Sequence, residues 1–154
     1  MDTVSRMGAV ASSIGRGLVA GAAGTAAMTV SSTVEQKLRG REASTAPADA
    51  AAKVLGIEGF CDDAAKSRFS NVVHWAYGTS WGIPRGLLDA AGLGPTAATA
   101  AHGAALWGSE QVMLPALGVA PPLWRWGAAE VAIDAWHHLV YTLATSAAYE
   151  ALGR

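Results

Sequence analysis

Several ionisable side chains lie inside stretches of this sequence that otherwise have the composition of apolar helices. They comprise all four histidines and three carboxylates, namely His74, His102, Glu110, Glu130, Asp134, His137 and His138. Imidazole and carboxylate groups can together ligate a divalent transition metal, relay protons or form a hydrogen-bond network. Because an ionisable group is costly in an apolar environment, we expect these side chains to face inward.

Helical spacing places these residues on common faces. Positions three, four, seven, eight or eleven residues apart share one side of an α-helix. Three stripes result. The first contains Glu130, Asp134, Tyr141 and either His137 or His138. The second contains His102 and Glu110, and the third contains His74 and Gly78. We expect the stripes to meet in one buried polar cluster of His74, His102, Glu110, Glu130, Asp134, His137 and Tyr141.

Three interpretations of this cluster remain open. Asp134-x-x-His137 places two donors on one face, so the first is a metal or haem site, with His74, Glu130, Asp134 and His137 as candidate metal ligands. The second is a proton relay, because histidine titrates near neutral pH. The third is a structural hydrogen-bond network that fixes helix register. A Ser–His–Asp hydrolase is disfavoured, since the chain has no G-x-S-x-G motif.

The composition excludes several classes of protein. Of the 154 residues, 51% are hydrophobic and 15% charged, which is too apolar for a disordered chain. The net charge is −1 and the pI about 6.4, so no basic surface exists for binding nucleic acid. The single cysteine, Cys61, excludes a disulfide scaffold and multi-cysteine metal motifs.

Charged residues concentrate between Glu35 and Arg68, and long uncharged stretches flank them. A transmembrane helix needs about 20 mostly apolar residues. We predict one all-α membrane domain (1–154) whose four transmembrane helices span about 17–38, 69–91, 96–117 and 124–152. Residues 1–16 form a lead-in and 39–68 a charged, partly helical connection. A soluble helical bundle is the alternative, because the mean hydropathy is only +0.26. A signal peptide is disfavoured, because the first apolar run begins late.

Glycines recur at a four-residue spacing within the second predicted helix. Gly78, Gly82 and Gly86 lie on one face, where small residues let helices approach closely in a bilayer. We interpret this face as a packing surface rather than a ligand loop. Arg85 is expected at the helix boundary, with its guanidinium reaching the lipid headgroups.

A weak internal repeat accompanies these features. Glu35-Gln36 near the end of the first predicted helix has a counterpart in Glu110-Gln111 of the third. His74-x-x-Tyr77 in the second helix corresponds to His138-x-x-Tyr141 in the fourth. The pattern suggests two helical hairpins of the same order.

Beyond these patterns, the chain resembles a family of small four-helix integral membrane proteins of actinobacterial type. The resemblance covers nearly the whole chain and rests on Gly24-Thr-Ala-Ala-Met-Thr29, Glu35-Gln36, His74-Trp75 with Gly78, Gly82 and Arg85, Glu110-Gln111, Pro121-Pro122, Glu130-x-x-x-Asp134-x-x-His137 and Tyr141. It implies a four-helix membrane fold and no particular activity. In that family the position after the matching histidine is often lysine. The resemblance therefore favours His137 over His138 as the shared polar group.

The sequence thus predicts a small integral, multi-pass protein of the bacterial cell membrane. Its His/Glu/Asp cluster would handle a proton or a divalent transition metal ion, and catalysis is not favoured. The glycine faces suggest a homo-oligomer. The alternative is a non-catalytic subunit or assembly partner of a larger membrane complex, contacted through 39–68. The positive-inside rule places that connection in the cytoplasm.

Overall fold

The computed structural model describes residues 3–154, which form helices and contain no strand. The all-α class predicted from the sequence is confirmed. In chain order the elements are α1 (Thr3–Arg39), α2 (Ala46–Leu55), α3 (Asp63–Ser80), α4 (Gly82–Ala90), α5 (Pro95–Ala116), the short 3-10 helix η1 (Leu123–Arg125) and α6 (Ala128–Leu152).

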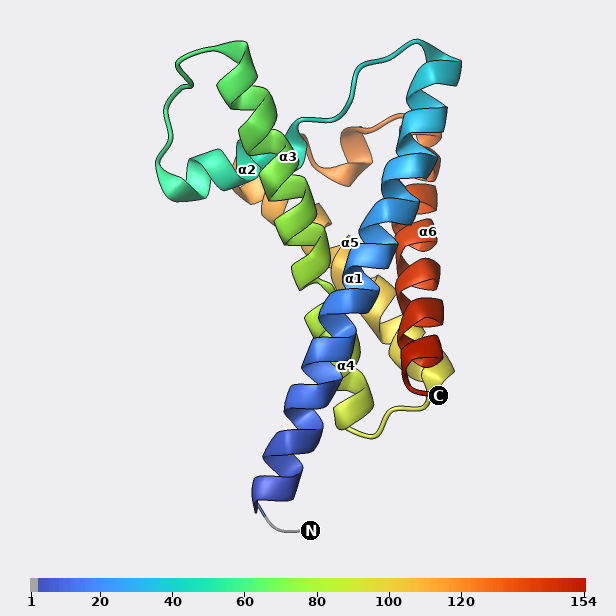
Figure 1. Ribbon diagram of the computed structural model, residues 1–154. Helices are drawn as coiled ribbons and strands as arrows, with labels where there is room; N and C mark the ends of the chain where they lie inside the picture. The colour runs from blue at the N-terminus through green and yellow to red at the C-terminus, as the bar shows by residue number, and fades with distance from the viewer. Residues whose placement is uncertain (1–2) are drawn as a thin grey trace.

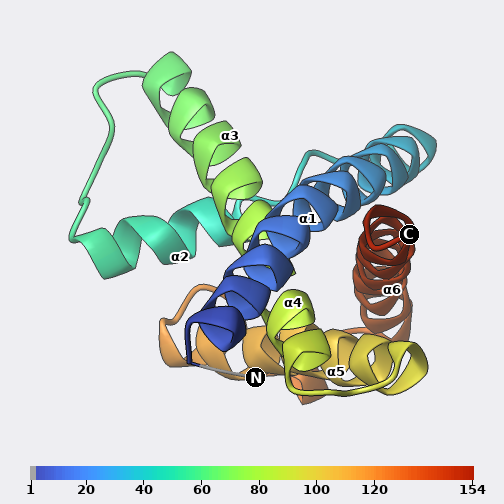
Figure 2. The ribbon, with the colours of Figure 1, turned by 60° about the horizontal axis from the view of Figure 1, so that its bottom comes forward.

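The long helix α1 organises the bundle. It packs against α6, α4 and α3, and α5 packs against α6 and α4 (Figures 1 and 2). Residues 46–68, which comprise α2 and the start of α3 and which we call the arm, project from the side of the bundle (Figure 1). The arm contacts the end of α5 through Lys53, whose Nζ donates to the backbone oxygen of Leu117 at 2.7 Å.

The structure differs from the predicted boundaries at four places. α3 begins at Asp63 rather than near residue 69, and α6 begins at Ala128, after η1, rather than at residue 124. The other two differences are larger. α1 already begins at Thr3, because 3–16 contain no proline and a nucleated helix propagates through such residues. The predicted helix over 69–91 is divided into α3 and α4 at Trp81. Pro84 causes this division, since it lacks an N–H and its ring collides with the carbonyl four residues earlier. At this division, the backbone oxygen of Trp81 accepts a hydrogen bond from Nε2 of His102 at 2.8 Å.

Glycines allow α1 and α4 to touch backbone to backbone. A Cβ atom added to Gly82 would overlap the carbonyl of Gly17, and one added to Gly86 would overlap that of Ser13. The third glycine of the run, Gly78, lies on α3, where an added Cβ would overlap the side chain of Thr25 on α1. A side chain at Gly82 or Gly86 would force α1 and α4 apart.

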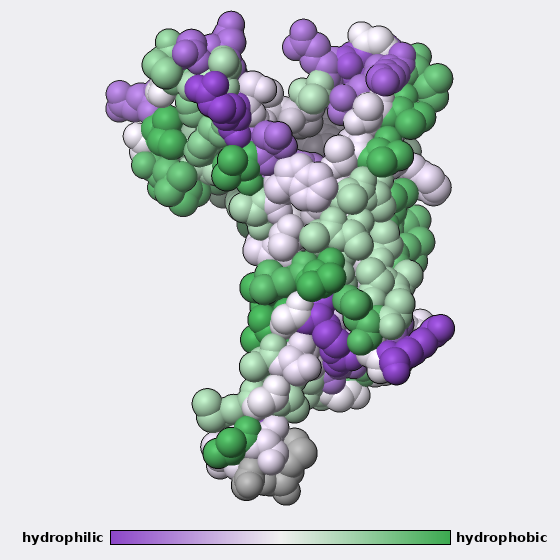
Figure 3. All heavy atoms as spheres, viewed as in Figure 1, coloured by the Kyte–Doolittle hydropathy of each residue, from purple (hydrophilic) through white to green (hydrophobic). Residues whose placement is uncertain are grey.

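The interior of the bundle is unusually polar, whereas large apolar side chains point outward. The buried polar and charged residues are Ser13, Thr25, Arg85, His102, His137, Thr142, Thr145 and Ser146. Exposed valine, leucine and tryptophan side chains include Val19, Val30, Trp136, Leu139 and Leu143. On the face seen in Figure 3, an apolar band separates polar residues at the upper end from a second polar group lower down.

Among the helices of residues 3–154, α1 alone is long and apolar enough to cross a membrane by length and composition. About a quarter of its most apolar stretch (28%) is buried in the molecule. Of the other helices, α2 and α4 are too short, and α3, α5 and α6 contain ionisable or other polar side chains that lower their hydropathy. By these criteria, the four membrane-spanning helices expected from the sequence reduce to one.

Candidate metal centre

The polar side chains expected to form one cluster are divided between two sides of α6 and two positions elsewhere in the bundle. Asp134 and His138 face α5, whereas Glu130 and His137 face α1. The two groups lie near the end of the bundle where α1 ends and α6 begins (Figure 1).

On the α5 side, Glu110 of α5 meets Asp134 and His138 of α6. One donor atom of each residue lies within 4.8 Å of the donor atoms of the other two. Nε2 of His138 is 2.7 Å from Oε2 of Glu110, and Nδ1 of His138 is 3.6 Å from Oδ1 of Asp134. We call these three residues the α5–α6 centre. Their arrangement brings together the oxygen and nitrogen donors that divalent transition metals prefer.

The hydrogen bonds around His138 leave its Nε2 available. Nδ1 lies 2.9 Å from the backbone oxygen of Asp134, which can only accept, so Nδ1 carries the proton. In the neutral ring, Nε2 then presents a lone pair beside Oε2 of Glu110. That oxygen is buried and lies at hydrogen-bonding distance from the ring nitrogen. Two lone pairs in contact call for a proton or a metal cation next to them.

A further polar group orients the second carboxylate of the centre. Nε1 of Trp107 on α5 donates a hydrogen bond of 2.7 Å to Oδ2 of Asp134. Metal-binding histidines and carboxylates characteristically have such outer partners, which fix the orientation of the ligand. Trp107 and the backbone oxygen of Asp134 thus support two of the three donors.

The negative charge of the α5–α6 centre has no basic partner. Within residues 3–154, neither Glu110 nor Asp134 forms an ion pair with a lysine or arginine, and His138 is the one ionisable contact of each. Two carboxylates beside a single imidazole therefore leave a local excess of negative charge. A bound cation would neutralise it.

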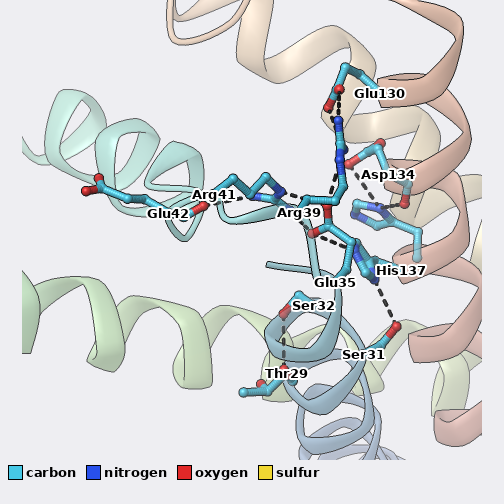
Figure 4. Close-up of polar contacts among 11 residues, drawn as sticks. Thr29, Ser31, Ser32, Glu35, Arg39, Arg41, Glu42, Glu130, Asp134 and His137 are labelled. Atoms are coloured by element: carbon cyan, nitrogen blue, oxygen red, sulfur yellow. Dashed lines mark hydrogen bonds and ion pairs between the residues drawn. The ribbon is translucent and has the colours of Figure 1, made fainter. Parts of the chain in front are cut away.

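On the α1 side, the carboxylates are neutralised within the protein. Arg39 lies between Glu35 and Glu130 and binds both, and Arg41 also binds Glu35 (Figure 4). The Nη2–Oε1 distance from Arg39 to Glu130 is 2.7 Å. We call the residues Glu35, Arg39, Arg41, Glu130 and His137 the α1–α6 cluster. Its two carboxylates are matched by two guanidinium groups.

These guanidinium groups also govern the ionisation of the carboxylates. The hydrogen bond from Arg41 lowers the pKa of Glu35, and that from Arg39 lowers the pKa of Glu130. Reciprocally, the hydrogen bond to Glu130 raises the pKa of Arg39. His137 is buried below these pairs, with Nδ1 2.9 Å from Oγ of Ser31 and Nε2 3.7 Å from Oε2 of Glu35.

The remaining predicted residues lie elsewhere and bridge helices. Nε2 of His74 on α3 is 2.8 Å from Oγ1 of Thr29 on α1. His102 is fully buried and bonded to the backbone at the α3–α4 junction. The hydroxyl of Tyr141 donates to the backbone oxygen of Gly78 at 2.6 Å. These contacts have the character of helix-to-helix hydrogen bonds.

The four ligands predicted for a metal, His74, Glu130, Asp134 and His137, are not brought together by the fold. Only Asp134 belongs to the α5–α6 centre, where Glu110 and His138 supply the other donors. The spacing of four residues between Asp134 and His138 contained the signal, because it places both on one helix face.

Sequence reasoning missed a second buried polar site at the other end of the bundle. Arg85 is fully buried rather than exposed at a helix boundary. It binds Glu150 and Ser146 of α6, and its guanidinium lies 4.4 Å from the ring centroid of Tyr149. Arg16 lies 4.6 Å from the same ring centroid. The position of Arg85 between Gly82 and Gly86, on a closely packed helix, was the available signal.

Of the polar groups in the bundle, the α5–α6 centre has the donor set and the charge for binding a cation. In the α1–α6 cluster and around Arg85, guanidinium groups pair with the carboxylates. The chain matches no protein-family model, no curated protein and no solved structure.

Proposed function

We propose that this chain is a small integral membrane protein that binds a divalent transition metal ion between α5 and α6. The ligands are Glu110, Asp134 and His138. One observation carries the proposal: three donor residues converge within 4.8 Å, and no lysine or arginine of the described chain neutralises them. Nε2 of His138 and Oε2 of Glu110 lie 2.7 Å apart, so the ion can take the place of the proton between them.

The distribution of polarity supports the membrane location. In water, a small helical bundle buries its large apolar side chains and exposes its polar ones. Here threonine, serine, histidine and arginine side chains share the interior with alanine, leucine and tyrosine, and many valine and leucine side chains face outward. The apolar band in Figure 3 matches such an inverted arrangement. In this proposal the uncharged stretch 17–34 of α1 crosses the bilayer together with α3–α4, α5 and α6. Glu35, Arg39, Arg41 and Glu130 lie beyond the apolar part, at the interface.

Metal content tests the binding site directly. Full-length protein purified in detergent, stripped with a chelator and equilibrated with Zn²⁺ should retain about one zinc per chain after desalting. The His138→Ala variant should lose the ion, with an affinity lower by at least about 100-fold. His137→Ala is the matched control, because it removes the neighbouring imidazole from the α1 side and should retain zinc. Wild-type protein without zinc, or equal retention by both variants, would overturn the proposal.

Membrane insertion is tested separately. A membrane pellet washed with alkaline carbonate should retain the protein, whereas release into the supernatant would contradict an integral location. The carbonate result is independent of the zinc result, because a soluble bundle can also hold a metal ion.

A second candidate function, assembly with another membrane protein, is supported by the arm. The arm leaves Val54 and Leu55 at the end of α2 exposed, and α2 packs mainly against α3 (Figure 1). A stoichiometric partner that co-purifies with the wild type, and is lost on Val54→Ser/Leu55→Ser substitution, would support this role. A homogeneous preparation of the chain alone from its native membrane would count against it.

A further inference from the structure

Three protein ligands leave part of a metal ion's coordination sphere unfilled. We propose that the ion in the α5–α6 centre keeps an open coordination position that takes water or a small anion, and that Trp107 keeps this position open. The inference rests on the proposed function, because it concerns the ion bound by Glu110, Asp134 and His138. With an open position, the metal ion can bind and activate an exogenous ligand, whereas a fully coordinated ion would only stabilise the fold.

The α5–α6 centre is limited to three donor residues. Among residues 3–154, no further histidine, cysteine, aspartate or glutamate joins these three donors. The nearest alternative is His137, but its Nδ1 is engaged with Ser31 on the opposite side of α6. Glu130 is held by Arg39. Structural zinc sites have four protein ligands, whereas catalytic zinc sites have three and a water molecule.

Asp134 would close the open position if both of its oxygens bound the ion. The indole N–H of Trp107 lies 2.7 Å from Oδ2 and engages that oxygen. Oδ1 is the oxygen that lies 3.6 Å from the His138 ring. Asp134 is therefore oriented to bind through Oδ1 alone. Trp107 acts through Asp134 and is a positioning residue, not a ligand.

The three donor side chains are partly exposed, although Oε2 of Glu110 is itself buried. The side chains of His138, Glu110 and Asp134 are 13%, 19% and 21% exposed, respectively. A sealed site would have donor side chains without any exposure. In a fully solvated site, Asp134 would lack the orienting contact with Trp107. A small ligand can thus reach an ion that remains held by the protein.

The experiment uses Co²⁺ as a spectroscopic probe and azide as the exogenous anion. Full-length protein in detergent is loaded with Co²⁺, and its visible absorption is followed during an azide titration. We expect a saturable spectral change in the wild type. If Co²⁺ binds but azide leaves the spectrum unchanged, the open position is refuted while the proposed function stands. If Co²⁺ does not bind at all, the proposed function fails and this inference fails with it.

Variants of Trp107 test the positioning role. Trp107→Phe should still bind Co²⁺, but its azide affinity should fall about tenfold or more, because Asp134 can then chelate through both oxygens. Trp107→Gln restores a donor for Oδ2 and should recover the azide response. Trp136→Phe, which alters an exposed tryptophan on α6, is the matched control. An unchanged azide affinity in folded Trp107→Phe would refute the positioning role.

A measurement on the wild type avoids dependence on the folding of these variants. The infrared difference spectrum between metal-loaded and metal-free protein reports the splitting of the carboxylate stretches. Monodentate carboxylates give a wide splitting and chelating ones a narrow splitting. The Asp134→Asn variant identifies the bands that belong to Asp134. A wide splitting supports the proposed role of Trp107, and a narrow one overturns it.

Discussion

His137 and His138 are neighbours in the sequence, but they face two differently charged environments. In the α1–α6 cluster, two arginines neutralise the two carboxylates near His137. In the α5–α6 centre, two carboxylates surround His138 without a basic partner in the part of the chain that the structure describes. The same pair of side-chain types thus forms a closed ion-pair network on one side of α6 and the proposed cation site on the other.

The difference can be traced to the residues that come after each glutamate in the sequence. Glu35-Gln36 and Glu110-Gln111 each bring a glutamate to one of the two histidines. Arg39 and Arg41 follow the first pair within six residues, whereas no basic residue follows the second until Arg125. A histidine and a carboxylate therefore do not by themselves define a metal site. The absence of a neutralising guanidinium group is equally important.

The largest effect is expected from importing a cationic side chain into the α5–α6 centre. Glu110→Arg replaces a ligand by a guanidinium group that can pair with Asp134, as Arg39 pairs with Glu130 in the other group. Zinc binding should become undetectable by calorimetry, a loss of at least about 100-fold in affinity. The circular dichroism spectrum should remain helical, because Glu110 is only partly buried.

The matched control for this prediction is Glu35→Gln on the α1 side. It removes a glutamate that lies beside the other histidine but already binds two arginines. Zinc affinity should change by less than about threefold. A comparable loss of zinc in Glu35→Gln would mean that both sides of α6 contribute to one site, and the contrast between the two histidines would disappear.

A smaller effect, in the opposite direction, is expected from removing the arginines. The Arg39→Gln/Arg41→Gln variant leaves Glu35 and Glu130 without a cationic partner beside His137. This side should then acquire a second, weaker zinc site, with about a tenfold lower affinity because its donors were not selected for metal geometry. Calorimetry should show two zinc ions per chain instead of one. A stoichiometry of one zinc ion per chain would indicate that removing the neutralising arginines is not sufficient to create a zinc site.

The sequence predicted the helices well, but it was less informative about which residues of different helices contact one another. Alanine-rich, uncharged stretches indicated helices, and the four-residue glycine run lies where α3 and α4 touch α1. The stripe through Glu130, Asp134 and the two histidines lies on the predicted helix. However, successive helical residues point about 100° apart. The stripe was therefore wide enough to face two neighbours, and the packing of α1 and α5 decided which residue faced which helix.

Long-range charge pairing was the least predictable feature. Arg85 is interpreted as a boundary residue when its own helix is considered alone. In the structure, Gly82 and Gly86 bring α4 against α1, and Glu150 near the end of α6 meets the guanidinium group. No local pattern relates Arg85 to a residue 65 positions later. The same holds for Arg39 and Glu130, which are 91 positions apart.

The smallest effect is expected from acid. The hydrogen bond from Arg41 lowers the folded-state pKa of Glu35 below its ordinary value of 4.5. A carboxylate with a depressed pKa stabilises the fold above its unfolded-state pKa, and this contribution is lost as the pH falls through the folded-state value. The unfolding temperature in detergent should therefore fall as the pH drops below about 4.5, by a few degrees at most because the pair is partly exposed to solvent. Arg41→Gln should be less sensitive to this drop, whereas Arg125→Gln, which alters an exposed arginine outside the cluster, should behave as the wild type. Equal acid sensitivity in Arg41→Gln and the wild type would show that Arg41 does not lower the pKa of Glu35. The charge environments of the α1–α6 cluster and the α5–α6 centre would then differ less than the ion pairs indicate.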